Sequence, residues 1–158
     1  MAINPNTDFT TGAVYTADQA NRFPRGIIAL ATSQTNYVLT TSTVIATGMS
    51  VTFTAVAGRY YRITYYEPQA QTPTVAGNTQ TDLRLTNAAG TQIGNNVFTN
   101  ETAANDQAQM IIVKVSTFSA GSVTLVGCAR TTSTTGTPNL IRDSAREALL
   151  LVEDIGPS

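Results

Sequence analysis

The sequence predicts an all-β protein, an antiparallel β-sandwich or jelly roll of about eight strands, preceded by an extended N-terminal arm and a short N-terminal helix. Three observations lead to this class. Short stretches rich in β-branched and aromatic residues recur along the chain, turn residues separate them, and no helix alternates with them as a parallel sheet would require. The 158 residues are enough for one domain with its own core.

Residues 1–25 are expected to form the arm and the short helix, and residues 26–158 the sandwich. The first residues are polar and show no periodicity, which is typical of an extended segment. Thr16 and Gln19 have the spacing of a capping box, so a short helix should begin after Thr16 and end before Pro24.

The rest of the chain has the pattern of short strands. About eight are expected among these candidate stretches: residues 27–31, 37–40, 43–46, 51–55, 59–67, 81–86, 91–93, 110–116, 122–129 and 149–154. Gly48 and Gly58 are expected to turn the chain, and Pro68 to end the strand before it. Residues 143–149 are expected to form a helical turn.

The stretch 59–67 is the clearest candidate strand. One face carries Tyr61, Ile63 and Tyr65, and the other carries Tyr60, Arg62, Thr64 and Tyr66. The stretch 110–116 places Ile111, Val113 and Val115 on one face and should form a hairpin with residues 122–129.

The charge balance argues against nucleic-acid and membrane partners. The net charge is −1, from 9 basic and 10 acidic residues, and the basic residues are scattered along the chain. A nucleic-acid binder or a polybasic membrane anchor would concentrate them. The N-terminus carries no basic segment of a secretory signal, and the longest apolar stretch, residues 27–31, is too short to span a bilayer. We therefore expect synthesis in the cytoplasm.

The side chains that most enzymes use for catalysis are scarce. The chain has no histidine and one cysteine, Cys128, which lies in an apolar stretch and is expected to be buried. Histidine-based triads and zinc sites are therefore excluded. Glu153 and Asp154 are adjacent and would point to opposite faces of a strand. We expect no catalytic residue, no cofactor, no metal and no enzymatic activity.

The tyrosines have two interpretations. Tyr61 and Tyr65 fill the core, while Tyr60 and Tyr66 lie on the outer face or at an interface; alternatively, the four form a stacking platform for sugars. The first interpretation is favoured. In either case Tyr60 and Tyr66 are the candidate exposed aromatic patch.

Three sequence blocks carry a family resemblance: residues 8–21 (DFTTGAVYTADQAN) with the Pro24-Arg25-Gly26 that follows, residues 48–63 (GMSVTFTAVAGRYYRI) and residues 151–157 (LVEDIGP). Together they resemble small accessory virion proteins of tailed bacteriophages, which are usually labelled head-decoration, minor tail or tail-fibre proteins. The resemblance implies a structural protein of the virion, made in the host cytoplasm. The major capsid protein or other virion proteins would then be its partners.

Two functions follow from this resemblance. The first and favoured one is a capsid decoration (cement) protein that binds the shell as a homo-oligomer, with a trimer favoured, through the arm and an edge of the sandwich. The candidate contact residues are Asn4, Pro5, Asp8, Phe9, Tyr15, Arg22 and Phe23. The second is a tail- or fibre-associated module that binds the host surface, although the chain has no heptads or repeats of a shaft. A cell-wall hydrolase is a third class, which the missing histidine disfavours.

Overall fold

The computed structural model describes residues 14, 16–40, 43–101 and 106–158, which form one short helix and ten strands. The sequence predicted about eight strands. The elements are α1 (Ala17–Asn21), β1 (Gly26–Ser33), β2 (Tyr37–Val38), β3 (Ile45–Ala55), β4 (Arg59–Gln71), β5 (Gly77–Leu85), β6 (Gln92–Asn100), β7 (Gln107–Ser116), β8 (Gly121–Thr131), β9 (Asn139–Leu140) and β10 (Ala148–Pro157).

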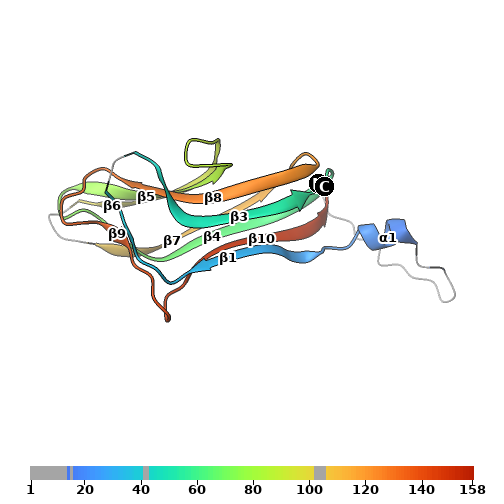
Figure 1. Ribbon diagram of the computed structural model, residues 1–158, viewed down its shortest axis with the longest axis horizontal. Coiled ribbons are helices and arrows are strands. Elements are labelled where there is room, and N and C mark those ends of the chain that lie inside the picture. The colour runs from blue at the N-terminus through green and yellow to red at the C-terminus, as the bar shows by residue number, and fades with distance from the viewer. Residues whose placement is uncertain (1–13, 15, 41–42, 102–105) are drawn as a thin grey trace.

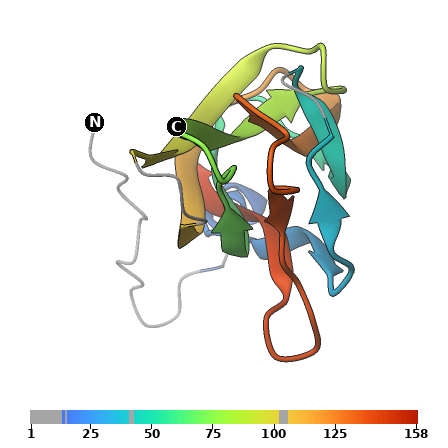
Figure 2. The ribbon, with the colours of Figure 1, turned by 90° about the vertical axis from the view of Figure 1, so that its left-hand side faces the viewer.

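The strands form two antiparallel sheets that pack face to face (Figures 1 and 2). In the first, called sheet A, the long strands lie in the order β1-β10-β4-β7, and the short pair β9-β2 extends one end. In the second, called sheet B, the order is β3-β8-β5-β6. β1 and β10, which are far apart in the sequence, are therefore neighbours in sheet A.

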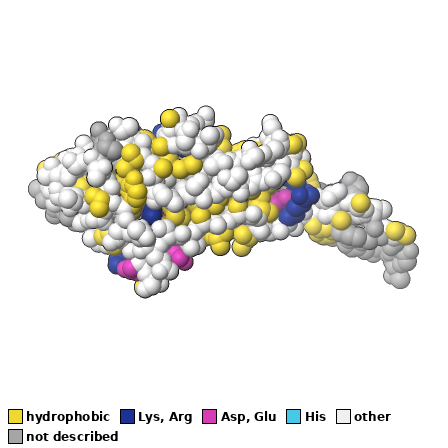
Figure 3. Space-filling model, in the orientation of Figure 1, with side chains coloured by type: hydrophobic (Ala, Val, Ile, Leu, Met, Phe, Trp, Pro, Cys, Tyr) yellow, Lys and Arg dark blue, Asp and Glu magenta, His cyan; other side chains and the backbone are white. Residues whose placement is uncertain are grey.

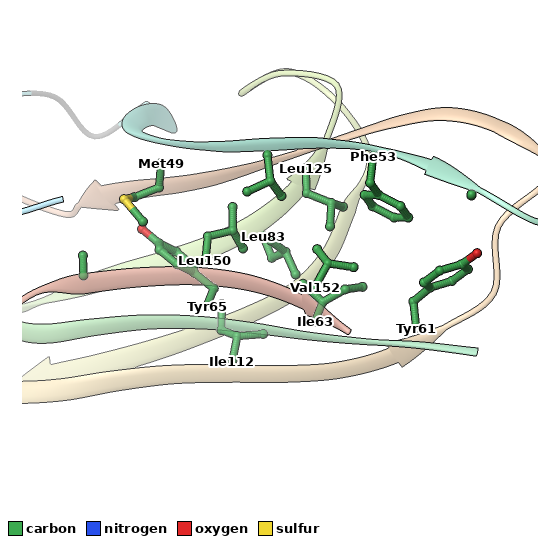
Figure 4. Packing of buried hydrophobic residues seen from close by; sticks show 13 residues of the cluster. Met49, Phe53, Tyr61, Ile63, Tyr65, Leu83, Ile112, Leu125, Leu150 and Val152 are labelled. Carbon is green, nitrogen blue, oxygen red and sulfur yellow. The ribbon is translucent and has the colours of Figure 1, made fainter. Parts of the chain in front are cut away.

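The main core lies between the two sheets, as the alternation in the sequence predicted. Tyr61, Ile63 and Tyr65 of β4 are buried. They face Phe53 and Leu125 of sheet B, and Figure 4 shows these side chains meeting between the layers. The buried residues of this main cluster are Met49, Val51, Phe53, Ala55, Tyr61, Ile63, Tyr65, Leu83, Ile112, Leu125, Ala148, Leu150 and Val152.

Bulges explain two places where the strands run longer than the sequence predicted. Gly48 was expected to turn the chain, but it lies at a bulge between Ala46 and Met49, and β3 runs through it as one strand. Its φ of 79° is a conformation that glycine adopts readily. Pro68 was expected to end β4, but it lies at the bulge before Ala70, where no ladder hydrogen bond from its nitrogen is needed.

The helical turn expected over residues 143–149 does not form. The Asp143 carboxylate instead accepts hydrogen bonds from the backbone nitrogens of Ala145 and Arg146, at 2.9 and 2.8 Å. This closes a tight turn, and β10 begins soon after it at Ala148. A local side-chain acceptor has competed successfully with the helix.

Arg59 connects α1 to the sandwich. Its buried guanidinium donates to both carboxylate oxygens of Asp154 in β10, at 2.5 and 2.7 Å. It also donates to the backbone carbonyls of Asn21, the last residue of the helix, and Phe23, which follows the helix. The helix therefore lies beyond one end of the sandwich, held at its C-terminal side (Figure 1).

Candidate interaction surface

β7 carries a row of aliphatic side chains that point away from the core. Ile111, Val113 and Val115 are 54%, 57% and 49% exposed, whereas Ile112, between the first two, and Met110, just before them, are buried. The sequence placed the three exposed residues on one face of a strand, and the structure shows that this face is the outer one. Edge strands usually carry polar residues on such a face.

The same apolar surface continues across the other three long strands of sheet A. The register aligns Val113 with Thr64 of β4, Thr64 with Leu151 of β10, and Leu151 with Leu30 of β1. Leu30 and Ile27 on β1 are more than half exposed. In Figure 3, hydrophobic side chains gather along the side of the body where β1 and β10 lie. We call this surface the outer face of sheet A: Ile27, Leu30, Thr32, Tyr60, Arg62, Thr64, Tyr66, Ile111, Val113, Val115, Leu149, Leu151 and Glu153.

The two charged residues of the outer face of sheet A form an ion pair with each other. Arg62 of β4 donates two hydrogen bonds to the carboxylate of Glu153 on the neighbouring β10, at 2.7 and 2.8 Å. Hydrogen bonding and the attraction between the two groups raise the pKa of Arg62 and lower the pKa of Glu153. Both groups are therefore charged at neutral pH, and the face as a whole has no net charge.

The outer face of sheet B has a different composition. Ser50, Thr52 and Thr54 of β3 alternate outward, and Ser122 and Thr124 of β8 lie opposite them. The hydroxyls of Thr52 and Thr124 are hydrogen-bonded at 2.9 Å. This part of the face is polar, as a solvated sheet face should be. On the outer face of sheet B, Val97 of β6 is an exposed large aliphatic side chain, whereas sheet A carries five such side chains on its outer face. The concentration of aliphatic residues on sheet A marks that side as a candidate contact surface.

The predicted arm residues Asn4, Pro5, Asp8, Phe9 and Tyr15 lie outside the described residues. Arg22 and Phe23 are described. Arg22 is exposed and lines an open hollow of about 400 Å³ between α1 and the end of the sandwich, together with Arg25 and Arg59. Basic side chains gather at this junction in Figure 3. Phe23 is half-buried.

Tyr60 and Tyr66, the candidate aromatic patch, both belong to the outer face of sheet A. Each is half-buried rather than fully exposed. They are six positions apart along β4, which is roughly 20 Å in a strand, and Arg62 and Thr64 lie between them on the same face. The two rings are therefore too far apart to stack on one sugar unit together.

The sequence contained a signal for the aliphatic residues that the candidate patch omitted. Residues 110–113 are four consecutive apolar residues, Met-Ile-Ile-Val. A continuous apolar run is typical of a strand that is covered on both faces, whereas a half-solvated strand alternates. The run therefore indicated a covered outer face as well as a core face.

A buried polar cluster lies at the other end of the sandwich. Arg142 donates to both carboxylate oxygens of Glu67, at 2.9 and 2.6 Å, and both side chains are almost completely buried. The Tyr65 hydroxyl donates to Glu67 at 2.5 Å and is hydrogen-bonded to Thr47 at 3.0 Å. Burial and the charge of Glu67 raise the pKa of Tyr65 well above its ordinary value. The cluster joins the segment around Arg142 to β4, and its burial closes it to a substrate.

Cys128 is fully buried on β8, as the sequence predicted. Burial raises the pKa of its thiol to about 11, so the thiolate that would act as a nucleophile is scarce at neutral pH.

Among the described residues, no three histidine, cysteine, aspartate or glutamate side chains are grouped as metal ligands would be. The described part of the chain also contains no helix that is long and apolar enough to cross a membrane.

Cys128 should not react with a thiol reagent in the folded protein. We expect 5,5′-dithiobis(2-nitrobenzoate) to label less than about a tenth of the chains at pH 8 under native conditions, and all of them in guanidinium chloride, because the buried thiol is both un-ionised and inaccessible. Absorbance of the released thiolate measures this. Rapid native labelling would contradict the burial of Cys128.

No known protein family matches the sequence, and no curated protein matches it either. Among solved structures, the chain is similar to dimeric latent PorU from Porphyromonas gingivalis, at 11% identity and a TM-score of 0.44. The match covers 93% of this chain but 14% of PorU. A second structure, described as CBM4, matches at 12% identity and a TM-score of 0.25, over 84% of this chain and 94% of the other. At these scores neither likeness supports a function.

Proposed function

We propose that this chain is a non-enzymatic structural protein of a bacteriophage virion, and specifically a capsid decoration protein that binds the shell as a homo-oligomer. The observation that carries the proposal is the aliphatic outer face of sheet A. Ile27, Leu30, Ile111, Val113 and Val115 are half of the ten large hydrophobic side chains exposed among the described residues, and they share this one face. A protein that functions in an assembly needs such a surface, and an isolated sandwich does not.

The strand order supports a capsid role by analogy of fold. We assign the sandwich to the jelly-roll type, because its eight long strands are arranged as β1-β10-β4-β7 and β3-β8-β5-β6, with the first and last strands adjacent. Jelly rolls occur in viral capsid proteins, and also in lectins and other families. The fold therefore agrees with the resemblance of residues 8–21, 48–63 and 151–157 to phage accessory proteins without deciding the function by itself.

The low content of charged residues fits attachment of the chain to the capsid through contacts that are mainly not electrostatic. Charged residues make up 12% of the chain, and the one ion pair on the outer face of sheet A is internally neutral. Contacts of this kind are little affected by salt. In the proposal, each copy makes weak contacts with the shell through the arm residues and the sandwich, and many copies together reinforce the capsid. With no histidine in the chain, the common catalytic constellations are unavailable to it.

Counting the chain in purified particles tests the proposal. Quantitative mass spectrometry of virions from the phage whose genome encodes the chain would measure its copies relative to the major capsid protein. We expect a stoichiometry comparable to that of the capsid protein, because decoration sites repeat over the whole shell. A few copies per particle would place the chain on the tail instead, and its absence from particles would overturn the virion proposal.

A further inference from the structure

We infer that the outer face of sheet A is covered by the same face of a second copy of this chain, around a two-fold axis. The inference rests on the proposed function as an assembly protein, and it names the occupant of the surface on which that proposal depends.

The order of the four long strands makes the face self-complementary. In β1-β10-β4-β7, the midline runs between β10 and β4. A two-fold axis along this midline, in the plane of the interface, places β4 over β10 of the second copy and β7 over its β1. Two such sheets can pack with their strands nearly aligned, as in the sandwich itself. The interface is then isologous and closes with two copies.

The side chains match under this operation. Because Val113, Thr64, Leu151 and Leu30 share one cross-strand row, the axis places Val113 over Leu30 of the second copy. Val115 correspondingly lies over Ile27 of the second copy. The exposed aliphatic residues at the two edges of the sheet, which no part of the described chain covers, therefore cover one another.

The ion pair is the strongest indication for this axis. Arg62 on β4 and Glu153 on β10 flank the midline in a single row. The two-fold operation exchanges their positions, so Arg62 lies over Glu153 of the second copy and Glu153 over its Arg62. Each charge then faces two opposite charges, one in its own chain and one in the other. A pairing that shifted this row would bury the charges against aliphatic side chains, which is costly.

The face is large enough for a stable pair. Four strands of 8–13 residues form it. At spacings of about 4.8 Å between strands and about 3.3 Å along them, they cover roughly 600 Å² per copy. Two copies would bury about 1,200 Å², which is the lower end of standard protein–protein interfaces.

The purified full-length chain should therefore be a dimer in sedimentation equilibrium and native mass spectrometry. Val113→Glu places a charge between Ile111 and Val115, where the pairing puts Val113 over Leu30 of the second copy, and should weaken dimerisation at least ~100-fold. Val97→Glu is the matched control, since Val97 is exposed on β6 of sheet B, and it should leave the dimer intact. Circular dichroism of each variant checks the fold. A monomeric wild-type chain, or a Val113→Glu dimer as tight as the control, would overturn the inference.

A complementary charge swap tests the axis itself. Arg62→Glu alone and Glu153→Arg alone each place like charges opposite one another in a homodimer, and each should be mainly monomeric. Mixed together they restore both inter-chain pairs, so native mass spectrometry should show the heterodimer and little of either homodimer. Loss of a purely intra-chain ion pair would not be rescued by mixing. Variants that dimerise separately, or a mixture that stays monomeric, would overturn this pairing.

The outcomes separate this inference from the proposed function. A dimer that is absent from virions would overturn the virion proposal and leave the pairing in place. A chain that is abundant in virions but monomeric when purified would support the virion proposal and overturn the two-fold pairing. A trimer, which the sequence analysis favoured, would contradict the two-fold axis, because an isologous face closes with two copies.

Discussion

Replacing Arg142 by methionine is expected to lower the free energy of unfolding by about 3–5 kcal/mol. The substitution leaves the Glu67 carboxylate buried with its charge uncompensated, and it removes hydrogen bonds to the carbonyls of Thr35 and Thr47 and to the Ser33 hydroxyl. Urea denaturation followed by circular dichroism measures the change. Methionine keeps most of the side-chain volume, so the loss reports the charge and its hydrogen bonds rather than a cavity.

Two further variants separate this effect from a general loss of side chains. Arg146→Met removes an arginine from an ion pair with Asp143 in the same segment, but both partners are more than two-fifths exposed, so a loss of less than about 1 kcal/mol is expected. The double variant Glu67→Met with Arg142→Met removes both buried charges and should recover much of the loss. A cost for Arg142→Met as small as that for Arg146→Met would show that the Glu67 carboxylate is not enclosed as described.

Ile63→Ala is expected to cost about 2–5 kcal/mol. Ile63 has no exposed surface, and its side chain lies at the middle of the core between the sheets, where the neighbours cannot close the space completely (Figure 4). Ile63→Val should cost less than half as much, because it removes one methylene. The midpoint of urea denaturation measures both.

The control for the core prediction is Val97→Ala, which removes a comparable amount of apolar side chain from an exposed position on β6. It should cost less than about 1 kcal/mol. Equal losses at Ile63 and Val97 would contradict the placement of Ile63 in the core.

The parts of the fold that depend on local pattern could be predicted from the sequence. The alternation of Tyr61, Ile63 and Tyr65 with polar neighbours correctly gave the core face of β4. The two-sheet antiparallel class followed from the spacing of such stretches. Bulges were the main source of error, because glycine and proline occur both in turns and at bulges, and only pairing with a partner strand shows which applies to Gly48 and Pro68.

The candidate surface was predicted less well, since it depends on which strands are neighbours. Ile111, Val113 and Val115 were correctly placed on one face, but the sequence alone did not give the direction of that face. Their direction is set by the pairing of β7 with β4, about 50 residues earlier in the chain. The Glu67–Arg142 pair spans 75 residues, and neither residue carries a local signal of its partner.

The position of β10 has a consequence for biosynthesis. β10 is the last of the ten strands along the chain, yet it lies inside sheet A, between β1 and β4. During translation β1 and β4 therefore have no common neighbour until residues 148–157 have left the ribosome. Sheet A can close only after most of the described chain has been made, so folding depends on contacts that are distant in sequence and should be slow. Until then the unpaired edges of β1 and β4 are exposed to other nascent chains, and a chaperone that shields them would raise the yield of folded protein.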